Sequence, residues 1–118
     1  MMINVLIVDD DQMILDSTKV FLEANDYQVT IAHDGIEAVE LMEKQSFDIA
    51  VVDLFMPRSG GIETIAKINN RMPVIAVSGV MKDRLSEKEL SHSLQVDQFL
   101  PKPFEPHRLI TVIDQLLN

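Results

Sequence analysis

Five short apolar runs alternate along the chain with segments of helical periodicity, and this alternation constrains the fold more than any other feature. The runs occupy residues 3–8, 28–32, 48–52, 73–77 and 98–101, and the last of them is the least regular. Their apolar residues mostly follow one another instead of alternating with polar ones. This pattern indicates strands buried on both faces, as in a parallel sheet covered by helices.

The segments between the runs carry apolar residues at the spacing of a helix face. They comprise residues 11–25, 35–45, 60–70, 84–94 and 105–118, and the apolar stripe is thinnest in 84–94. Each segment predicts a helix with one buried stripe. The predicted stripe residues are Ile14, Phe21 and Leu22; Ile36, Val39 and Met42; Ile62, Ile65 and Ile68; Leu85, Leu90 and Leu94; and Leu109, Val112, Ile113 and Leu116.

Strands that alternate with helices form βαβ units with right-handed crossovers. The sequence therefore predicts one α/β domain over residues 1–118, a doubly wound, flavodoxin-like (βα)5 fold whose five-stranded parallel sheet has the order 2-1-3-4-5. A chain of 118 residues is long enough for one ordinary core and too short for two. In such sheets the functional crevice lies beyond the carboxyl ends of the strands.

The charge and composition exclude several classes of function. The formal net charge of −9 argues against direct binding of nucleic acid, because affinity for DNA rests largely on Lys and Arg side chains that neutralise phosphates. No apolar run approaches the roughly 20 residues of a membrane helix, and the N-terminus lacks the pattern of a signal peptide. With no cysteine in the chain, these observations predict a cytoplasmic protein without a membrane contact.

Reactive polar residues follow four of the predicted strands. Asp9 and Asp10 follow the first run, Asp53 the third, Ser78 the fourth and Lys102 the fifth. In the strand order 2-1-3-4-5 these four strands lie side by side, so three carboxylates, a hydroxyl and an ammonium converge on one small volume. A desolvated carboxylate is unfavourable unless a partner compensates its charge, and this set supplies the partners of Asp53.

A set of three carboxylates, a hydroxyl and an ammonium supports few kinds of reaction. Clustered carboxylates repel one another unless a divalent cation neutralises them, and oxygen ligands with open water positions suit Mg²⁺. A carboxylate beside that ion can attack phosphorus and form an aspartyl phosphate. Phosphoryl transfer needs mostly positioning and charge neutralisation, which Mg²⁺ and Lys102 would supply, and Ser78 could hydrogen-bond a phosphoryl oxygen.

Several other polar residues have structural interpretations. Asp11 is predicted to cap the first helix instead of binding a metal. His33, His92 and His107 share no metal-ligand spacing and are expected on the surface. Gly60 and Gly61 follow a strand without the Lys of a phosphate-binding loop, so they predict a turn.

The set resembles the receiver domain of bacterial response regulators, which act in two-component signalling. The resemblance rests on the segments VLIVDDD, VVDLFMPRSGG, VIAVSG and FLPKPF, in that order, and covers essentially the whole chain. It implies a single receiver domain, either stand-alone or truncated before an effector domain.

The resemblance also implies the role of each site residue. Asp53 would be the phosphoacceptor, and Mg²⁺ would be bound by Asp10, by Asp9 directly or through water, by Asp53 and by the main-chain carbonyl of Phe55. Lys102 would pair with a phosphoryl oxygen. Three further features are implied: a hydroxyl at Ser78 that moves toward the phosphoryl group, an aromatic switch at Phe99, and a cis peptide bond between Lys102 and Pro103.

The implied activity is signalling instead of turnover catalysis. A sensor histidine kinase or histidine phosphotransfer protein would donate to Asp53, Ser78 would shift and Phe99 would rotate into the space left behind. The surface built from residues 84–94, 98–101 and 105–118 would then change its preference for a downstream effector protein or fused effector domain. The resemblance also allows a phosphorylation-dependent dimer, and slow loss of the phosphoryl group without a partner.

This chain departs from the family pattern at some positions. Phe55 and Val80 stand two residues after the acceptor and the hydroxyl position, where polar side chains are frequent in the family. The usual small residues before the switch aromatic are replaced in the segment QVDQF, and the predicted helix 84–94 is polar. These departures affect the expected kinetics and partner surface, not the acceptor itself.

Two alternatives stay open at this stage. One is a pseudo-receiver, a folded adaptor that is never phosphorylated. The other is a phosphatase of the haloacid-dehalogenase type, in which Asp9 of the Asp9-x-Asp11 pair would be the nucleophile, although the cap insertions and final acidic motif of that family are missing.

Overall fold

The computed structural model describes residues 2–54, 56, 60–68, 71–79 and 96–118. These residues form one five-stranded parallel sheet in the order β2-β1-β3-β4-β5, which confirms the predicted fold class and strand order. The strands are β1 (Ile3–Val8), β2 (Tyr27–Ala32), β3 (Ile49–Asp53), β4 (Val74–Ser78) and β5 (Gln98–Pro101). The predicted runs 3–8 and 98–101 coincide with β1 and β5, and the other three differ by a single residue at one or both ends.

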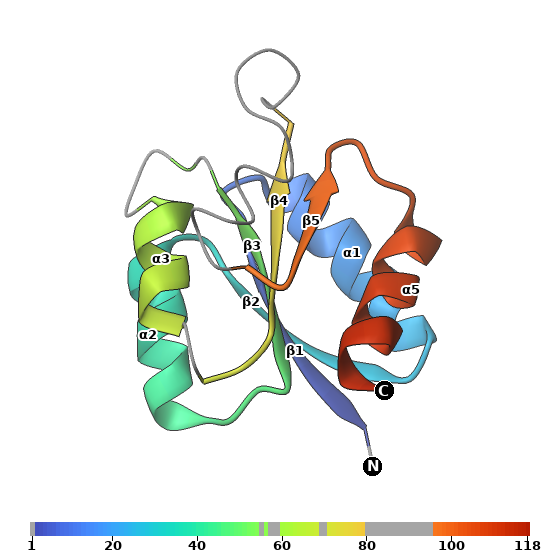
Figure 1. Cartoon of the computed structure of the whole chain (residues 1–118), viewed down its shortest axis with the longest axis horizontal. Helices are drawn as coiled ribbons and strands as arrows, with labels where there is room; N and C mark the ends of the chain where they lie inside the picture. The colour runs from blue at the N-terminus through green and yellow to red at the C-terminus, as the bar shows by residue number, and fades with distance from the viewer. Residues whose placement is uncertain (1, 55, 57–59, 69–70, 80–95) are drawn as a thin grey trace.

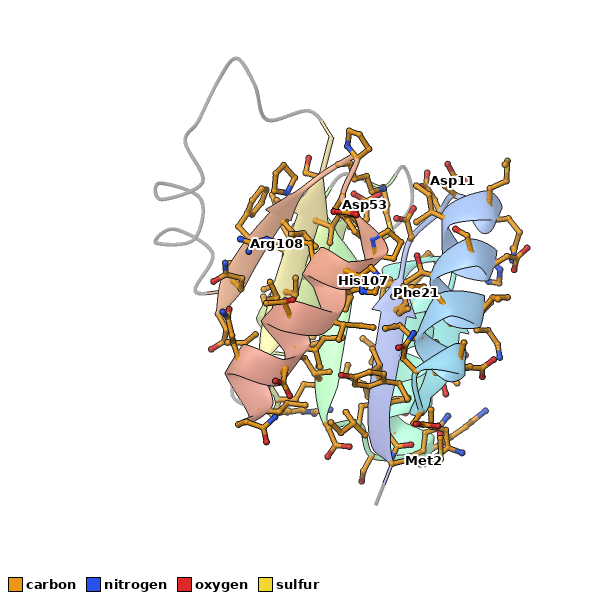
Figure 2. All side chains as sticks on the ribbon, turned by 90° about the vertical axis from the view of Figure 1, so that its right-hand side faces the viewer. Met2, Asp11, Phe21, Asp53, His107 and Arg108 are labelled. Atoms are coloured by element: carbon orange, nitrogen blue, oxygen red, sulfur yellow. The ribbon has the colours of Figure 1, made fainter. Side chains whose placement is uncertain are left out.

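Helices cover both faces of the sheet (Figure 1). They are α1 (Gln12–Ala24), α2 (Gly35–Lys44), α3 (Gly61–Ile68) and α5 (Pro106–Leu117). Helices α1 and α5 lie on one face and α2 and α3 on the other (Figure 1), and Figure 2 views the face that α1 and α5 cover. The helix predicted over residues 84–94 lies outside the described residues, and no described helix has the length and apolar character to span a membrane.

The core consists of two apolar clusters, one on each face of the sheet, because successive strand residues point to opposite faces. Val5 and Ile7 of β1 pack with the residues of α1 and α5, whereas Leu6 and Val8 pack with those of α2 and α3. All residues of β3 and β4 are buried. The continuous apolar runs of the sequence therefore reflect strands that contribute to both clusters at once.

The predicted stripes of α2 and α3 are wrong at their first residue, whereas Ile65 and Ile68 of α3 are buried as predicted. Ile36 was assigned to the buried face of α2, but it is 60% exposed, and Gly35 and Ala38 are buried instead. Ile62 of α3 is likewise exposed, and the buried face of that helix begins one residue earlier, at Gly61. Small residues at these points remove the side chains that would hold each helix away from the sheet, so the buried face does not follow the largest apolar residues.

The stripe of α1 is also displaced. Leu15, Thr18 and Leu22 form its buried face, while Ile14 and Phe21 are only partly buried. The stripe of α5 is confirmed for Leu109, Val112 and Ile113, and Leu116 is partly buried at the end of the helix. The displacement in α1 leaves Ile14 and Phe21 at the rim of the molecule, on the side that faces α5.

Candidate functional site

The predicted site residues come together at the carboxyl edge of the sheet. Asp9 follows β1, Asp53 ends β3 and Ser78 ends β4, and the register places Val8 beside Val52 and Asp53 beside Val77. Asp9, Asp53 and Ser78 are 3%, 6% and 1% exposed, whereas Asp10 is exposed. The strands thus hold two carboxylates and a hydroxyl in a largely desolvated position.

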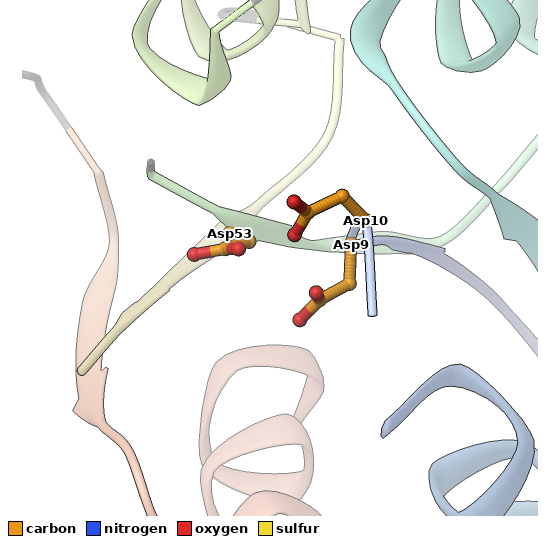
Figure 3. A group of neighbouring side chains, drawn as sticks. All are labelled: Asp9, Asp10 and Asp53. Atoms are coloured by element: carbon orange, nitrogen blue, oxygen red, sulfur yellow. The ribbon is translucent and has the colours of Figure 1, made fainter. Parts of the chain in front are cut away.

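Three carboxylates form the acidic part of the site. Asp9, Asp10 and Asp53 each place a carboxylate oxygen within 4.8 Å of those of the other two, and the carboxylates of Asp9 and Asp10 are turned to the side on which Asp53 lies (Figure 3). Like charges at this separation repel one another, most strongly for the two buried groups. A hard divalent cation with oxygen ligands relieves that repulsion, so the donor set is compatible with Mg²⁺.

Lys102 brings a positive charge to these carboxylates. Its Nζ lies 2.8 Å from Asp9 Oδ2 and 3.5 Å from Asp53 Oδ2, and its side chain is 19% exposed. Burial by itself lowers the pKa of Lys102, but the hydrogen bond to Asp9 and the charges of Asp53 and Asp9 outweigh it and raise that pKa above the ordinary value. The ammonium is therefore a fixed positive charge at physiological pH.

Main-chain hydrogen bonds fix the strand ends on which these groups stand. The N–H of Asp9 donates to the carbonyl of Ala32 at 3.1 Å, and that of Leu54 donates to Val77 at 2.9 Å. The N–H of Lys102 donates to the carbonyl of Ser78 at 2.9 Å, which ties the end of β5 to the end of β4. The side chains of the site are thus carried by ordered backbone and not by a free loop.

Gly61 is a site residue that sequence reasoning missed. A Cβ atom built on it would lie 1.9 Å from the carbonyl oxygen of Asp53 and 2.6 Å from the Cα of Leu54. Both neighbours are backbone, so no side-chain movement relieves the clash. The residue allows the start of α3 to pack directly on the end of β3, and the Gly60–Gly61 pair was the available signal, although it predicted only a turn.

The structure also tests the predictions made for a helix cap, the histidines and a cis peptide bond. Asp11 caps α1, since its Oδ1 accepts from the N–H groups of Met13 and Ile14 at 3.0 and 3.4 Å, and this confirms its predicted role. His33 and His107 are exposed as predicted, and His92 lies outside the described residues. The Lys102–Pro103 peptide bond is cis as predicted.

Phe99, the predicted switch residue, is buried in β5 and packs in the cluster on the α2 and α3 face. It pairs with Ala76 of β4, and Ser78 stands two residues further along that strand. Because alternate strand residues share a face, Ser78 and Phe99 point to the same side of the sheet. Phe55 and Val80 lie outside the described residues. The metal ligand predicted at the carbonyl of Phe55 therefore stays a prediction.

The sequence comparison identifies the family of this site. The response regulator receiver domain model matches residues 5–114, which is nearly the whole chain. The chain belongs to this family. It is therefore a receiver domain of two-component signalling, a signalling domain instead of a classical turnover enzyme.

Curated relatives and solved structures agree with this assignment. The chain is 32% identical to the response regulator MprA of Mycobacterium ulcerans, over all of this chain and 51% of that protein. It is 34% identical to the response regulator GtcR of Aneurinibacillus migulanus, over 98% of this chain and 48% of that protein. The receiver domain thus spans about half the length of these curated relatives.

Among solved structures, a CheY-like receiver domain from Methanospirillum hungatei superposes with a TM-score of 0.87 at 33% identity, and the match covers 99% of this chain and 94% of the other. The chemotaxis protein CheY4 of Vibrio cholerae gives a TM-score of 0.89 at 27% identity, with coverage of 99% and 100%. The family assignment argues against the phosphatase alternative, and so does the use of Asp11 as a helix cap.

Proposed function

We propose that this receiver domain accepts a phosphoryl group on Asp53 from the phosphohistidine of a sensor histidine kinase or a histidine phosphotransfer protein. The observation that carries the proposal is the position of Asp53, a buried carboxylate at the end of β3 that faces two other carboxylates and lies 3.5 Å from the ammonium of Lys102. A buried acid beside the ammonium of Lys102 and the carboxylates of Asp9 and Asp10 suits reversible binding of a metal and a phosphoryl group.

The surroundings of the three acids favour Asp53 as the nucleophile. Asp9 accepts hydrogen bonds on both oxygens, from the N–H of Asp11 at 2.9 Å and from Lys102 at 2.8 Å. Asp10 is exposed to solvent. Asp9 and Asp10 are therefore better suited to hold Mg²⁺ with Asp53, and the main-chain carbonyl of Phe55 is proposed as a further ligand.

The transfer step needs little from the protein beyond position and charge. A carboxylate oxygen of Asp53 attacks phosphorus and an O–P bond forms, while the N–P bond of the donor breaks and the imidazole leaves with its electron pair and takes up a proton. Mg²⁺, when bound, neutralises charge on the phosphoryl oxygens and on the carboxylates. The ammonium of Lys102 pairs with a phosphoryl oxygen as it moves away from Asp9.

The output of the domain would depend on Ser78 and Phe99. They project from neighbouring strands to the same side of the sheet, and both are buried. Movement of the Ser78 hydroxyl toward a phosphoryl group on Asp53 would open space on that side, and rotation of Phe99 into the space would alter the surface near β5 and α5. A downstream effector protein or fused effector domain would read that change as a population shift.

Phosphorylation by a small donor tests this function directly. The chain would be incubated with phosphoramidate and Mg²⁺ and analysed by intact mass spectrometry, and we expect one phosphoryl group per chain. Asp53→Asn should abolish the adduct because an amide is not a nucleophile, whereas Asp16→Asn, on the exposed surface of α1, should leave it unchanged.

Two results would favour one of the alternative functions instead. A phosphoryl group that persists in Asp53→Asn and disappears in Asp9→Asn would move the chemistry to the nucleophile of the phosphatase alternative. A wild-type chain that takes no phosphoryl group from small donors or kinases, and binds no beryllofluoride, would be a pseudo-receiver.

A further inference from the structure

A second concave site lies between α1 and α5, on the face of the sheet opposite α2 and α3. Its volume is about 480 Å³. Helix α1 contributes Ile14, Ser17, Thr18 and Phe21, and the segment after β5 contributes Pro103 and Phe104. Figure 2 shows Phe21 of α1 and His107 of α5 between the two helices, where their rings meet edge to face with centroids 5.2 Å apart. The contact joins the two helices beside this cavity.

The walls of the cavity are mostly apolar. Among the described residues that line it, Lys102 alone carries a charge, and its ammonium already pairs with Asp9 and Asp53. A charged ligand would therefore lose its hydration without gaining a partner, which is unfavourable. The hydroxyl of Ser17 donates to the carbonyl of Ile14 at 3.3 Å and keeps lone pairs that can accept from a ligand.

We propose that the cavity between α1 and α5 binds a small, uncharged aromatic molecule of about two fused rings that carries a hydrogen-bond donor. Its volume lies in the range of roughly 300–1,000 Å³ that is usual for small-molecule sites, and such sites combine apolar walls with a few polar groups. The rings of Phe21 and Phe104 provide aromatic contacts for a flat ligand, and Ser17 provides the acceptor.

The cavity is joined to the carboxylate site through the stem of Lys102. A Cβ atom built on Gly79 would lie 3.4 Å from the Cβ and 4.0 Å from the Cδ of Lys102, so Gly79 packs on one part of this stem while the stem also lines the cavity. If the ammonium leaves Asp9 for a phosphoryl group, the stem changes position and so does the cavity wall. This step rests on the proposed function, and it makes ligand binding and phosphorylation reciprocally coupled.

Indole is a suitable probe because it is neutral, has two fused rings and carries one N–H donor. An NMR titration of the ¹⁵N-labelled chain should show saturable shifts confined to residues that line the cavity, with a Kd of about 1 mM or tighter. Ser17→Phe should fill the cavity and weaken binding at least about tenfold. Val20→Phe adds the same ring to α1 at an exposed position that does not line the cavity, and it should bind indole as the wild type does.

The results of these titrations distinguish specific binding of a small molecule from nonspecific binding and from occupation of the cavity by a partner protein. Equal binding to both variants, or shifts scattered over the surface, would overturn the proposal, because the probe would then bind nonspecifically. Failure of the folded wild-type chain to bind indole would also overturn it and leave a side chain of a partner protein as the better occupant.

The coupling has its own readout. With Mg²⁺ and beryllofluoride added, the affinity for indole should change at least about threefold, and an unchanged affinity would overturn the coupling. Bound beryllofluoride is observed separately by ¹⁹F NMR. If that signal does not appear while indole still binds, the proposed function fails and the cavity proposal stands.

Discussion

The ammonium of Lys102 is closer to Asp9 than to Asp53, at 2.8 Å against 3.5 Å. Both carboxylates are buried, so this one cation compensates two charges that have little contact with water. Lys102 is thus more than a partner for Asp53 and for an incoming phosphoryl group, the two roles that the sequence suggests for it. It also compensates the charge of the site before any ligand arrives, and under the proposed function it would change its partner when a phosphoryl group binds.

Replacing Lys102 by Met should separate these two roles. Without the ammonium, two buried carboxylates lose a counter-ion, and in the absence of metal we expect the free energy of unfolding to fall by about 1–3 kcal/mol. This is less than for a fully buried pair because Lys102 keeps some contact with water. Loss of the positive charge should strengthen Mg²⁺ binding about two- to tenfold, whereas beryllofluoride binding should weaken. Urea unfolding and Mg²⁺ titrations measure these effects.

Lys44→Met provides the matched control, because Lys44 is exposed at the end of α2 and contacts none of the three carboxylates. It should leave the affinity for Mg²⁺ unchanged. Weaker Mg²⁺ binding in Lys102→Met would mean that the lysine positions the carboxylates for the metal instead of competing with it.

Asp11 should contribute to stability without contributing to metal binding. Its carboxylate accepts from the N–H groups of Met13 and Ile14, which have no partner inside the helix. Asp11→Ala should therefore lower the free energy of unfolding by about 0.5–2 kcal/mol, and Asp11→Asn, which retains a capping oxygen, should cost less. Both variants should bind Mg²⁺ with nearly the wild-type affinity. A large loss of Mg²⁺ affinity in Asp11→Asn would place this carboxylate among the metal ligands.

The two adjacent glycines at the start of α3 should respond differently to alanine. A Cβ on Gly61 would overlap the backbone of Asp53, whereas nothing lies within 4 Å of a Cβ on Gly60. Gly61→Ala should lower the free energy of unfolding by at least about 1–3 kcal/mol, the usual cost of overpacking, and should weaken beryllofluoride binding because Asp53 moves. Gly60→Ala should be close to neutral in both assays. Equal effects of the two changes would show that α3 can shift without disturbing β3.

The fold and the position of the site follow from local patterns that are strong in this sequence. Runs such as residues 3–8 and 48–52 specify strands buried on both faces, and the reactive residues follow those strands directly. Asp53 and Asp9 could therefore be placed together as soon as the strand order was inferred. The helix faces could not be placed as well, because the large apolar residue Ile36 is exposed while Ala38 is buried.

The interactions that the sequence did not predict join residues of different secondary-structure elements. The preference of Lys102 for Asp9 connects β5 to β1, and the contact of Gly61 with Asp53 depends on how closely one helix approaches one strand. Hydrophobic periodicity describes each segment separately and does not give the distance between residues of two different segments. These details require the packed structure.

The single tyrosine of the chain provides a test of the packing between β2 and α5. Burial raises the pKa of the Tyr27 phenol, and the negative charge of Asp114 raises it further. The chain contains no tryptophan, so the phenolate absorbance reports Tyr27 alone. We expect the folded chain to titrate above the ordinary pKa of about 10. Because the folded state holds this proton more tightly, the associated stability is present below about pH 10 and is lost as the pH rises through the folded pKa.

Asp114→Asn should lower the pKa of Tyr27 but leave it above the ordinary value, since burial is the larger cause. Glu40→Gln removes a charge from the exposed side of α2, which covers the opposite face of the sheet, and it should not change the titration. Circular dichroism at each pH would show that the chain is still folded. An ordinary pKa for Tyr27 in the folded chain would contradict the burial of the phenol, and an unchanged pKa in Asp114→Asn would mean that α5 does not bring Asp114 close to the start of β2.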